Sequence, residues 1–488
     1  MLNEFPLDIL TERCRQLQQP GSRDLRADCE RPKRLTVKSS LALTSVLIVC
    51  CGFAISGEAD AVLRTKIEAI VQPLINAEYL VGAVVGVIDT DGRHVFGLGR
   101  LRPGSDKHPD GDTVYEIGSI TKVFTATLLA EMALRGLLEL DDPVEKLLPD
   151  SVRVPRKDDR QITLEDLATH TSGLPRVPAD FGLAQTNDPY AAYDDRKLYT
   201  FLSGFTLPRA PGKEYEYSNV GAGLLGHALS RRAGKPYEEL LVKTLCEPLG
   251  LSSTRIKLGN ELRRRLASGH NLDCEPVGNW SFDVLAGAGA LRSTANDMLR
   301  FAAANLGLTS STLSPAIEST HEVRRESAGM GLGWHWIQEG STLFHNGGTG
   351  GYRSFLALDK RRKLCVVMLT NTAAEILDEA GLAVLDALRG KAVAALALRV
   401  PAKVKPSVLD SYAGVYRLAP LVKFTVTSES GKIFVQITGQ PRARIYPESD
   451  EKFFYRAVDA QITFEKGKDG RVTSLVLHQS GQDQRAQK

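Results

Sequence analysis

The chain has 488 residues, of which 43% are hydrophobic and 24% are charged. This is the composition of an ordinary globular protein, and the length allows a large core and more than one domain. The 61 basic and 58 acidic residues leave a net charge of only +3, so nothing favours nucleic acid as a partner, and a small or neutral partner is the default expectation.

Residues 1–61 are typical of an N-terminal leader. A basic cluster, "RPKRLTVK", precedes an uncharged segment at 39–55, and Ala59-Asp60-Ala61 follows. This is the layout of a secretory signal peptide with a small-residue cleavage site. We therefore expect an exported protein, either periplasmic after cleavage or membrane-anchored if the hydrophobic segment is retained. A membrane is a partner only in the second case, and a buried core helix is the alternative interpretation of the segment.

The cysteines predict neither a disulfide scaffold nor a metal site. Four of the seven precede residue 61, and Cys246, Cys274 and Cys365 remain, widely spaced and without a CxxC pair. Cys365 lies in "KLCVVMLTN" and is expected in a buried strand. No HExxH motif or paired-carboxylate metal loop occurs, so we expect no metal and no cofactor. The histidines His170, His227 and His270 are expected to be structural.

Residues 62–398 predict an α/β domain. A helical pattern at 62–78 is followed by two strands around an Asp91-Gly92 turn, which is a strong hairpin signal. The patterns from 119 to about 307 are mostly helical, β-branched runs return at 341–370, and a helical segment at 374–398 closes the domain. The sequence therefore predicts an antiparallel sheet flanked by helices and interrupted by an all-helical insertion.

A second domain is expected after a linker at 399–408, "RVPAKVKP", whose prolines and lysines break the helical pattern. Residues 409–488 contain six short alternating segments separated by glycines and turn residues. This spacing predicts a small all-β antiparallel barrel or sandwich.

The segment "YEIGSITKVFTATLLAEM" carries the first chemical signal. Ser119 stands where strand-like sequence gives way to a helix, and Lys122 follows one turn later on the same face. A lysine in a partly buried site loses proton affinity and can activate a serine as a nucleophile, while the helix N-terminus offers free N–H groups to an oxyanion. The alternative is a helix-capping serine followed by a solvent-facing lysine.

Two later segments supply further polar groups. Tyr217-Ser218-Asn219 precedes an apolar helix, where a tyrosine hydroxyl could relay a proton and an asparagine could orient a lysine; the alternative is a core tyrosine with Asn219 as the helix cap. His345-Asn346-Gly347 is expected on a strand, followed by three glycines that allow close backbone approach. An ordinary, partly exposed histidine is the alternative for His345.

Together and in this order, these segments resemble the S-x-x-K, Y-x-N and [KH]-x-G motifs of the serine β-lactamase and penicillin-binding protein superfamily. The resemblance is to the class C β-lactamase branch, which includes DD-peptidases and esterases, and covers about residues 63–395. Further stretches resemble that branch: "ITLEDLATHTSGLP", "EPLGLSSTRI", "GAGALRSTANDMLRF" and "GMGLGWHW". Residues 409–488 resemble the lipocalin-like barrel appended to some of these enzymes.

The resemblance implies a β-lactamase/transpeptidase-like fold and a set of site roles. Ser119 would be the acylated nucleophile, with Lys122 and Tyr217 sharing the general-base and general-acid work. Asn219 would bind Lys122 and the substrate amide. The N–H groups of Ser119 and Gly348 would form the oxyanion hole. The substrate-binding strand would comprise His345, Asn346 and Gly347.

His345 is the main departure from the family pattern, because many β-lactamases have lysine there. We expect His345 to meet the substrate carboxylate, and with an ordinary pKa near 6.5 it would bind that group better as the pH falls toward 6. Thr121, where class C enzymes usually show serine or alanine, is a milder change.

The expected function is therefore that of a serine hydrolase acting on β-lactams or D-Ala-D-Ala peptides through a Ser119 acyl-enzyme. Carboxylesterase activity on small esters is an alternative, and a catalytically inactive binding protein on the same scaffold is another. The GxGxxG match at 221–226 follows no buried strand, so those glycines are expected to serve helix packing rather than dinucleotide binding. The oligomeric state is left open.

Overall fold

The computed structural model describes residues 47–488 except 180, 182–187, 339 and 441, so most of the expected leader lies outside the described residues. The first described element is α2 (Leu47–Asn76), which contains the helix expected at 62–78 but begins earlier and runs unbroken through Ala61. Within the described part of the chain, no helix is both long enough and apolar enough to cross a bilayer.

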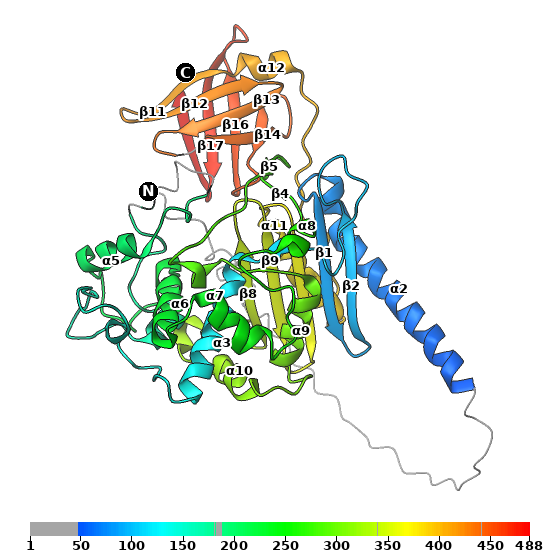
Figure 1. Ribbon diagram of the computed structural model, residues 1–488. Coiled ribbons are helices and arrows are strands. Elements are labelled where there is room, and N and C mark those ends of the chain that lie inside the picture. The colour runs from blue at the N-terminus through cyan, green and yellow to red at the C-terminus, as the bar shows by residue number, and fades with distance from the viewer. Residues whose placement is uncertain (1–46, 180, 182–187, 339, 441) are drawn as a thin grey trace, which may run out of the picture.

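A six-stranded antiparallel sheet forms the centre of the larger domain, with the strand order β2-β1-β10-β9-β8-β7 (Figure 1). The expected hairpin is confirmed, although its two-residue loop is Thr90-Asp91, because Asp89 pairs with Gly92. The strand bounds are β1 (Gly82–Asp89), β2 (Gly92–Gly99), β7 (His335–Ile337), β8 (Thr342–Gly348), β9 (Arg353–Asp359) and β10 (Leu364–Thr370).

Helices cover both faces of this sheet. Helices α2 and α11 (Ile376–Leu388) pack on one face, and α9 (Ala295–Asn305) packs on the other. Alternate residues of β1 enter the two cores: Val85 faces α2, whereas Val84 faces the α9 side. Because both faces are buried, these strands are almost continuously apolar, as the "KLCVVMLTN" segment and its buried Cys365 illustrate.

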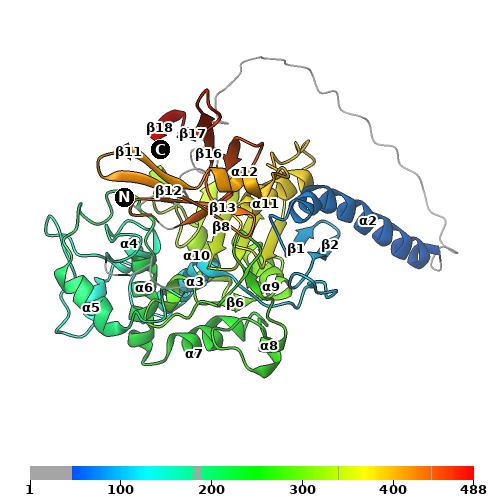
Figure 2. The same ribbon diagram turned by 90° about the horizontal axis from the view of Figure 1, so that it is seen from above.

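The expected helical insertion lies between β2 and β7. Figure 2 shows α4, α5 and α6 on the opposite side of the molecule from α2. The α-helices of this region are α3 (Thr121–Leu134), α4 (Leu164–Ala168), α5 (Asp195–Gly204), α6 (Asn219–Ala233), α7 (Tyr237–Leu241), α8 (Asn260–Arg264) and α10 (Ser314–His321). Short strands also occur: β3 (Tyr115–Glu116), β4 (Gly269–His270), β5 (Pro276–Val277) and β6 (Arg292–Ser293).

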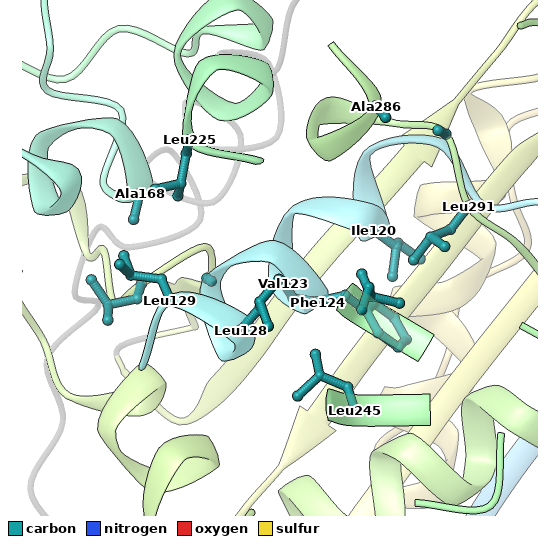
Figure 3. Close-up of a cluster of buried hydrophobic side chains, with 14 of the residues drawn as sticks. Ile120, Val123, Phe124, Leu128, Leu129, Ala168, Leu225, Leu245, Ala286 and Leu291 are labelled. Carbon is teal, nitrogen blue, oxygen red and sulfur yellow. The ribbon is translucent and has the colours of Figure 1, made fainter. Parts of the chain in front are cut away.

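Helix α3 runs through the middle of the domain and is surrounded by apolar side chains (Figure 3). Every residue from Thr121 to Met132 is buried. Phe124 stacks on Phe301 at a centroid distance of 4.1 Å, and Leu291 lies beside Ile120. Because α3 is buried on all sides, its polar side chains also lie inside the protein. This burial affects the protonation state of Lys122.

The expected helix at 374–398 is too long, because α11 ends at Leu388. Gly390 follows with φ of +77°, a left-handed conformation that ends helices, and residues 391–405 have no regular secondary structure. Helix α12 (Pro406–Ser411) then leads into the second domain and places Leu409 and Tyr412 in its core.

The second domain is a closed antiparallel barrel of eight strands, which fits the lipocalin-like domain expected. The interior is filled by aromatic side chains, including Phe424, Phe453 and Phe464. Two of its strands, β11 and β18, were missing from the sequence-based expectation. The strands are β11 (Gly414–Ala419), β12 (Val422–Glu429), β13 (Lys432–Ile437), β14 (Ala443–Pro447), β15 (Lys452–Phe454), β16 (Ala460–Lys466), β17 (Val472–Gln479) and β18 (Gln482–Gln487).

Cationic side chains of the barrel contact the first domain. Arg456 lies between the rings of Tyr79 and Tyr446, at 4.5 and 4.2 Å from their centroids, and donates hydrogen bonds to the carbonyls of Ala77 and Glu78 at the end of α2. Arg444 forms an ion pair of 2.8 Å with Asp273, and Lys432 one of 2.7 Å with Glu275. Both carboxylates belong to the turn between β4 and β5, which lies directly below the barrel in Figure 1.

Candidate active site

Ser119 lies in a short 3₁₀ helix, η1 (Gly118–Ile120), that leads directly into α3. The structure brings Lys122 to it: the Nζ atom lies 2.9 Å from the Ser119 Oγ. The same Nζ lies 2.9 Å from the Oδ1 of Asn219 and 2.7 Å from the carbonyl oxygen of Ala288. A solvent-facing lysine, the alternative considered from the sequence, is therefore wrong.

The environment of Lys122 favours a neutral amine. The residue is only 3% exposed, and burial together with the charge of Arg176 holds the pKa of Lys122 well below its usual value of 10.5. A neutral amine has two N–H groups and one lone pair. The carbonyl oxygens of Asn219 and Ala288 can accept the two N–H groups, which leaves the lone pair directed at the Ser119 hydroxyl. This arrangement allows Lys122 to take the serine proton.

Tyr217 completes the polar cluster on the other side of the nucleophile. Its ring centroid lies 4.8 Å from the Nζ of Lys122, and the ring of His170 packs against it at 4.4 Å. Burial raises the pKa of Tyr217, and this effect outweighs the opposing influence of Arg176 and of a hydrogen bond with Ser119. Tyr217 therefore remains a neutral phenol, which suits it to donate a proton or a hydrogen bond.

Asn219 is the first residue of α6 but does not cap it. The cap is Ser218, whose hydroxyl accepts a hydrogen bond of 2.8 Å from the Gly221 N–H. Asn219 is thus free to bridge two side chains, accepting from Lys122 and donating to the Tyr190 hydroxyl at 3.0 Å. The glycines that follow pack closely against the 285–287 segment, as expected from the sequence: Cβ atoms on Gly223 and Gly226 would lie 2.5 Å from Leu285 and 2.8 Å from Gly287.

The end of β8 packs directly against the η1 turn. A Cβ atom on Gly347 would lie 2.1 Å from the Ile117 carbonyl oxygen and 2.8 Å from the Ser119 amide nitrogen, and one on Gly118 would lie 2.7 Å from the Gly348 amide nitrogen. The two backbones touch because glycine occupies each position. The amides of Ser119 and Gly348 are consequently held close together beside the nucleophile, as an oxyanion hole requires.

His345 is buried completely and does not have the ordinary pKa expected from the sequence. Its Nδ1 contacts the Asn346 carbonyl oxygen at 2.6 Å, and its Nε2 has no partner among the described residues. Burial, followed by the neighbouring His335 and Lys122, lowers the pKa of His345 well below 6.5. The expectation of a histidine that gains positive charge near pH 6 is therefore wrong, because this imidazole is held neutral.

Asn346 and Gly347, expected on the substrate-binding strand, make contacts inside the protein, and their part in substrate binding stays a prediction. Successive strand residues point to opposite faces, so when His345 faces Tyr217 the side chain of Asn346 faces away. It donates a hydrogen bond of 2.7 Å to Asp378 of α11, on the other face of the sheet. Gly347 packs against Ile117. Gly348, by contrast, is exposed at the strand end.

The structure adds side chains to the site that the sequence motifs missed. Tyr190 stacks on Phe282 at 4.3 Å and lies 5.4 Å from Trp280, which makes an aromatic wall beside Asn219. Arg176 lies over the ring of Tyr217, at 5.0 Å from its centroid. It directly follows "ITLEDLATHTSGLP", a stretch of the family resemblance that ends at Pro175, so its position next to that stretch was the available signal.

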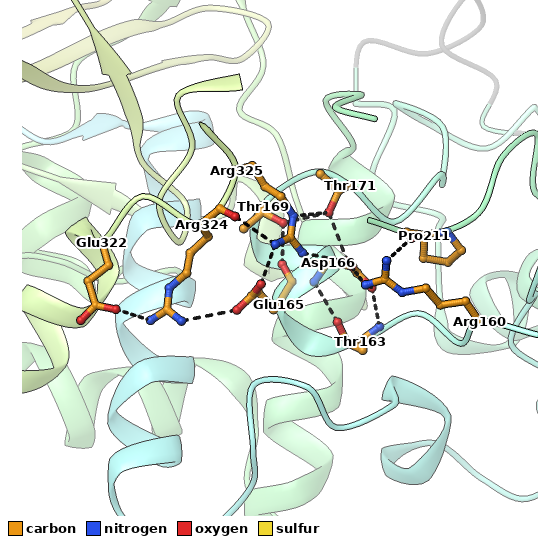
Figure 4. Close-up of polar contacts among 10 residues, drawn as sticks. All are labelled: Arg160, Thr163, Glu165, Asp166, Thr169, Thr171, Pro211, Glu322, Arg324 and Arg325. Atoms are coloured by element: carbon orange, nitrogen blue, oxygen red, sulfur yellow. Dashed lines mark hydrogen bonds and ion pairs between the residues drawn. The ribbon is translucent and has the colours of Figure 1, made fainter. Parts of the chain in front are cut away.

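His170, expected to be structural, has a supporting role in the site: its Nδ1 accepts the Ser218 N–H at 3.1 Å. The loop that carries it is fixed by an ion-pair network (Figure 4). Asp166 caps the start of α4 and is fully buried, with Arg160 and Arg325 at 3.2 and 3.1 Å from its Oδ1. This network holds the backbone that leads to His170 and Thr171, and through them the segment that carries Tyr217.

Comparisons with known proteins agree with this geometry. Residues 67–391 match the family model described as Beta-lactamase, and residues 398–488 match a domain of unknown function, DUF3471. The D-alanyl-D-alanine-carboxypeptidase/endopeptidase AmpH of Escherichia coli K12 is 30% identical over 302 residues, covering 58% of this chain and 77% of that protein.

Two further relatives extend the comparison. Penicillin-binding protein 4* of Bacillus subtilis is 25% identical over 80% of this chain and 91% of its own length. The crystal structure of a beta-lactamase/D-alanine carboxypeptidase from Yersinia pestis superimposes with a TM-score of 0.59 at 26% identity, covering 67% of this chain and 98% of that one.

Proposed function

The chain belongs to the beta-lactamase family, and on that premise we propose that it hydrolyses β-lactams or peptides ending in D-Ala-D-Ala through an acyl-enzyme on Ser119. The relatives named above as beta-lactamases and D-Ala-D-Ala carboxypeptidases support a serine hydrolase. One observation carries the proposal. The buried amine of Lys122 has a lowered pKa, and its Nζ lies 2.9 Å from the Ser119 hydroxyl oxygen.

The proposed first half-reaction gives each of these groups a defined step. Lys122 removes the proton from the Ser119 hydroxyl as the oxygen attacks the substrate carbonyl, and the amides of Ser119 and Gly348 bind the resulting oxyanion. The carbon–nitrogen bond then breaks, Tyr217 protonates the departing nitrogen, and Lys122 returns a proton to Tyr217. Water later cleaves the ester by the reverse proton transfers, which regenerates the Ser119 hydroxyl.

Carboxylesterase activity is a second candidate, and one observation favours it. Since His345 is buried and held neutral, the third motif contributes no positive charge toward a substrate carboxylate. An uncharged ester needs no such charge, and the Ser119, Lys122 and Tyr217 chemistry would be unchanged.

Active-site labelling tests whether Ser119 is the nucleophile. A fluorescent penicillin and a fluorophosphonate should label the wild-type protein once per chain, whereas Ser119→Ala should fold normally and take no label. Ser310→Ala, at an exposed serine far along the chain, is the control and should be labelled like the wild type. A labelled adduct on Ser119→Ala would contradict the assignment, and an unlabelled wild type would favour the inactive binding protein.

Steady-state kinetics then distinguish the substrates. Values of kcat/KM for nitrocefin, for a D-Ala-D-Ala peptide and for p-nitrophenyl butyrate, each measured beside Ser119→Ala, rank the three activities. A clear preference for the neutral ester would favour the carboxylesterase alternative over hydrolysis of β-lactams and peptides.

Export is a further part of the proposal and depends on the leader sequence alone. Expression in a Gram-negative host should give a product outside the cytoplasm that is shortened near Ala61 or retained at the membrane. Intact-mass analysis that finds residue 1 still attached to a soluble cytosolic protein would contradict it.

A further inference from the structure

Arg176 is an exposed residue whose positive charge lies beside the candidate active site. The centre of its guanidinium lies 5.0 Å from the centroid of the Tyr217 ring, and its charge acts on Lys122 and Tyr190 as well. Contact with an aromatic ring uses none of the N–H groups of the guanidinium as hydrogen-bond donors to an oxygen. These N–H groups lie in the plane and remain available for a planar acceptor.

The position of this arginine is fixed by its own backbone. The carbonyl oxygen of Arg176 accepts the Asn219 N–H at 2.9 Å, and the preceding carbonyl, that of Pro175, accepts the Ser218 hydroxyl at 2.7 Å. The loop is thereby joined at two points to the segment that carries Tyr217. The main chain at Arg176 is therefore already ordered before a ligand binds, so no ordering of this loop opposes binding.

Arg176 forms no ion pair with any of the described residues, in contrast to its cationic neighbour. Arg353, the other guanidinium near Gly348, donates hydrogen bonds to Asp378 and lies 3.9 Å from Glu375. No carboxylate of the described chain lies within ion-pair distance of Arg176, whose contact there is the Tyr217 ring. The Glu375 carboxylate acts on Arg176 only through space, so among the described residues the guanidinium has no ion-pair partner that a substrate would have to displace.

We propose that Arg176 binds a carboxylate carried by the substrate and thereby selects anionic over neutral acyl substrates. The inference rests on the proposed function and narrows its substrate class to acyl compounds that carry a carboxylate. Arg176 thus takes over the binding of the substrate carboxylate, the role that we expected from the sequence for His345. The carboxylate can lie on the acyl group or on the leaving group, and the two arms of the test distinguish these positions.

Matched ester pairs provide the test. For the acyl side, the mono-4-nitrophenyl ester of adipic acid is compared with 4-nitrophenyl hexanoate, which carries a methyl group in place of the carboxylate. For the leaving-group side, 3-carboxyphenyl hexanoate is compared with phenyl hexanoate. The measured quantity is the ratio of kcat/KM for the anionic ester to that for its neutral partner. Any effect of the substitution on the pKa of Lys122 acts on both esters and cancels in this ratio.

The variants are Arg176→Gln, Arg176→Glu and Arg176→Lys, with Arg196→Gln as a control that removes the same charge from the exposed surface of α5. In at least one pair we expect the ratio to fall about 10-fold in Arg176→Gln, as for the loss of a charge-assisted hydrogen bond. It should fall further in Arg176→Glu, mainly through KM. Arg176→Lys keeps the charge but not the planar N–H groups, so its ratio should lie between those of the wild type and Arg176→Gln. Arg196→Gln should stay close to the wild type.

Unchanged ratios in both pairs for Arg176→Gln and Arg176→Glu would overturn the inference and leave the proposed function standing, since the neutral esters would still be hydrolysed. If the wild type hydrolysed none of the four esters and Ser119 took no fluorophosphonate, the proposed function would fall, and this inference with it.

Discussion

At the scale of single residues, burial sets the protonation state of the whole site. It lowers the pKa of Lys122 and of three histidines, His170, His335 and His345, and it raises the pKa of Tyr217. In each case the uncharged form is favoured, because transferring a charge from water to the protein interior is costly. The site thus combines a neutral base with a neutral acid, which proton transfer at neutral pH requires.

The state of His345 can be tested through the pH dependence of KM. Since its pKa lies well below 6.5, His345 stays neutral from pH 8 to pH 6, and protonation cannot improve carboxylate binding in this range. We expect KM for nitrocefin and for a neutral ester to follow parallel pH profiles between pH 6 and 8. A KM for nitrocefin that falls selectively toward pH 6 would show that the histidine becomes charged.

The sequence predicted the reacting groups better than their surroundings. Ser119 and Lys122 are one helical turn apart, so local geometry alone predicts their contact, and the family motifs add Tyr217 and Asn219. Arg176 and the Ala288 carbonyl reach Lys122 only through packing between distant segments, which no local pattern reveals. The pKa of His345 was missed for the same reason, because the neighbours that bury it come from other elements.

At the scale of elements, the contact between η1 and β8 holds the two proposed oxyanion-hole amides together. Gly347 fills this contact, whereas Gly348 at the next position is exposed and lies beside the guanidinium of Arg353. Neither glycine has a positive φ, so the difference between the two positions is one of space. The two neighbouring positions of β8 therefore differ in whether they have room for a side chain.

Substituting each glycine by alanine tests this difference. In Gly347→Ala the new methyl group would lie 2.1 Å from the Ile117 carbonyl oxygen, so η1 must move, at a cost of about 1–3 kcal/mol for overpacking. We expect a lower melting temperature and little fluorophosphonate labelling. In Gly348→Ala the nearest atom is the Nη1 of Arg353 at 3.2 Å, and the melting temperature should stay near that of the wild type. Equal melting temperatures for both variants would contradict a tight contact at Gly347.

Elements with a strong local sequence pattern were predicted. Elements that form only by pairing with other strands were not. The β1–β2 hairpin and strands β8 to β10 have continuous apolar runs and clear turns. Strand β18, "QDQRAQ", is almost entirely polar, and only closure of the barrel between β11 and β17 makes it a strand. The apolar residues that follow Leu388 favoured a longer α11, but the left-handed Gly390 ends it.

At the scale of the whole molecule, the barrel supports the turn between β4 and β5, and that turn leads into the aromatic wall. Asp273 and Glu275 are paired with barrel cations, while Trp280, a few residues later, lies next to Tyr190. Arg456 adds hydrogen bonds to the end of α2. The barrel and the first domain should therefore unfold together.

Arg456→Ala tests this coupling. The substitution removes two cation–π contacts and the hydrogen bonds to the Ala77 and Glu78 carbonyls, of which Glu78 keeps a weak one from the Cys274 thiol, and this should weaken the interface by roughly 2 kcal/mol. We expect the single thermal transition of the wild type to separate into two, with the barrel unfolding independently. Arg471→Ala, at a barrel arginine whose side chain is 88% exposed, should keep one transition. One unchanged transition in Arg456→Ala would mean that this arginine does not couple the domains.

The pairing of β1 with β10 also determines when the protein can fold. Ala83 of β1 lies opposite Thr370 of β10. Strand β1 therefore cannot pair with β10 until almost the whole domain has left the ribosome. At ~5–20 residues per second, that delay lasts roughly tens of seconds. During this time the β1–β2 hairpin has no second neighbour, and the apolar faces of β1 remain open to chaperones or to a translocation channel. The β1 edge that faces β10 consequently finds its partner only late in synthesis, so this part of the domain leaves the ribosome before it can complete the sheet.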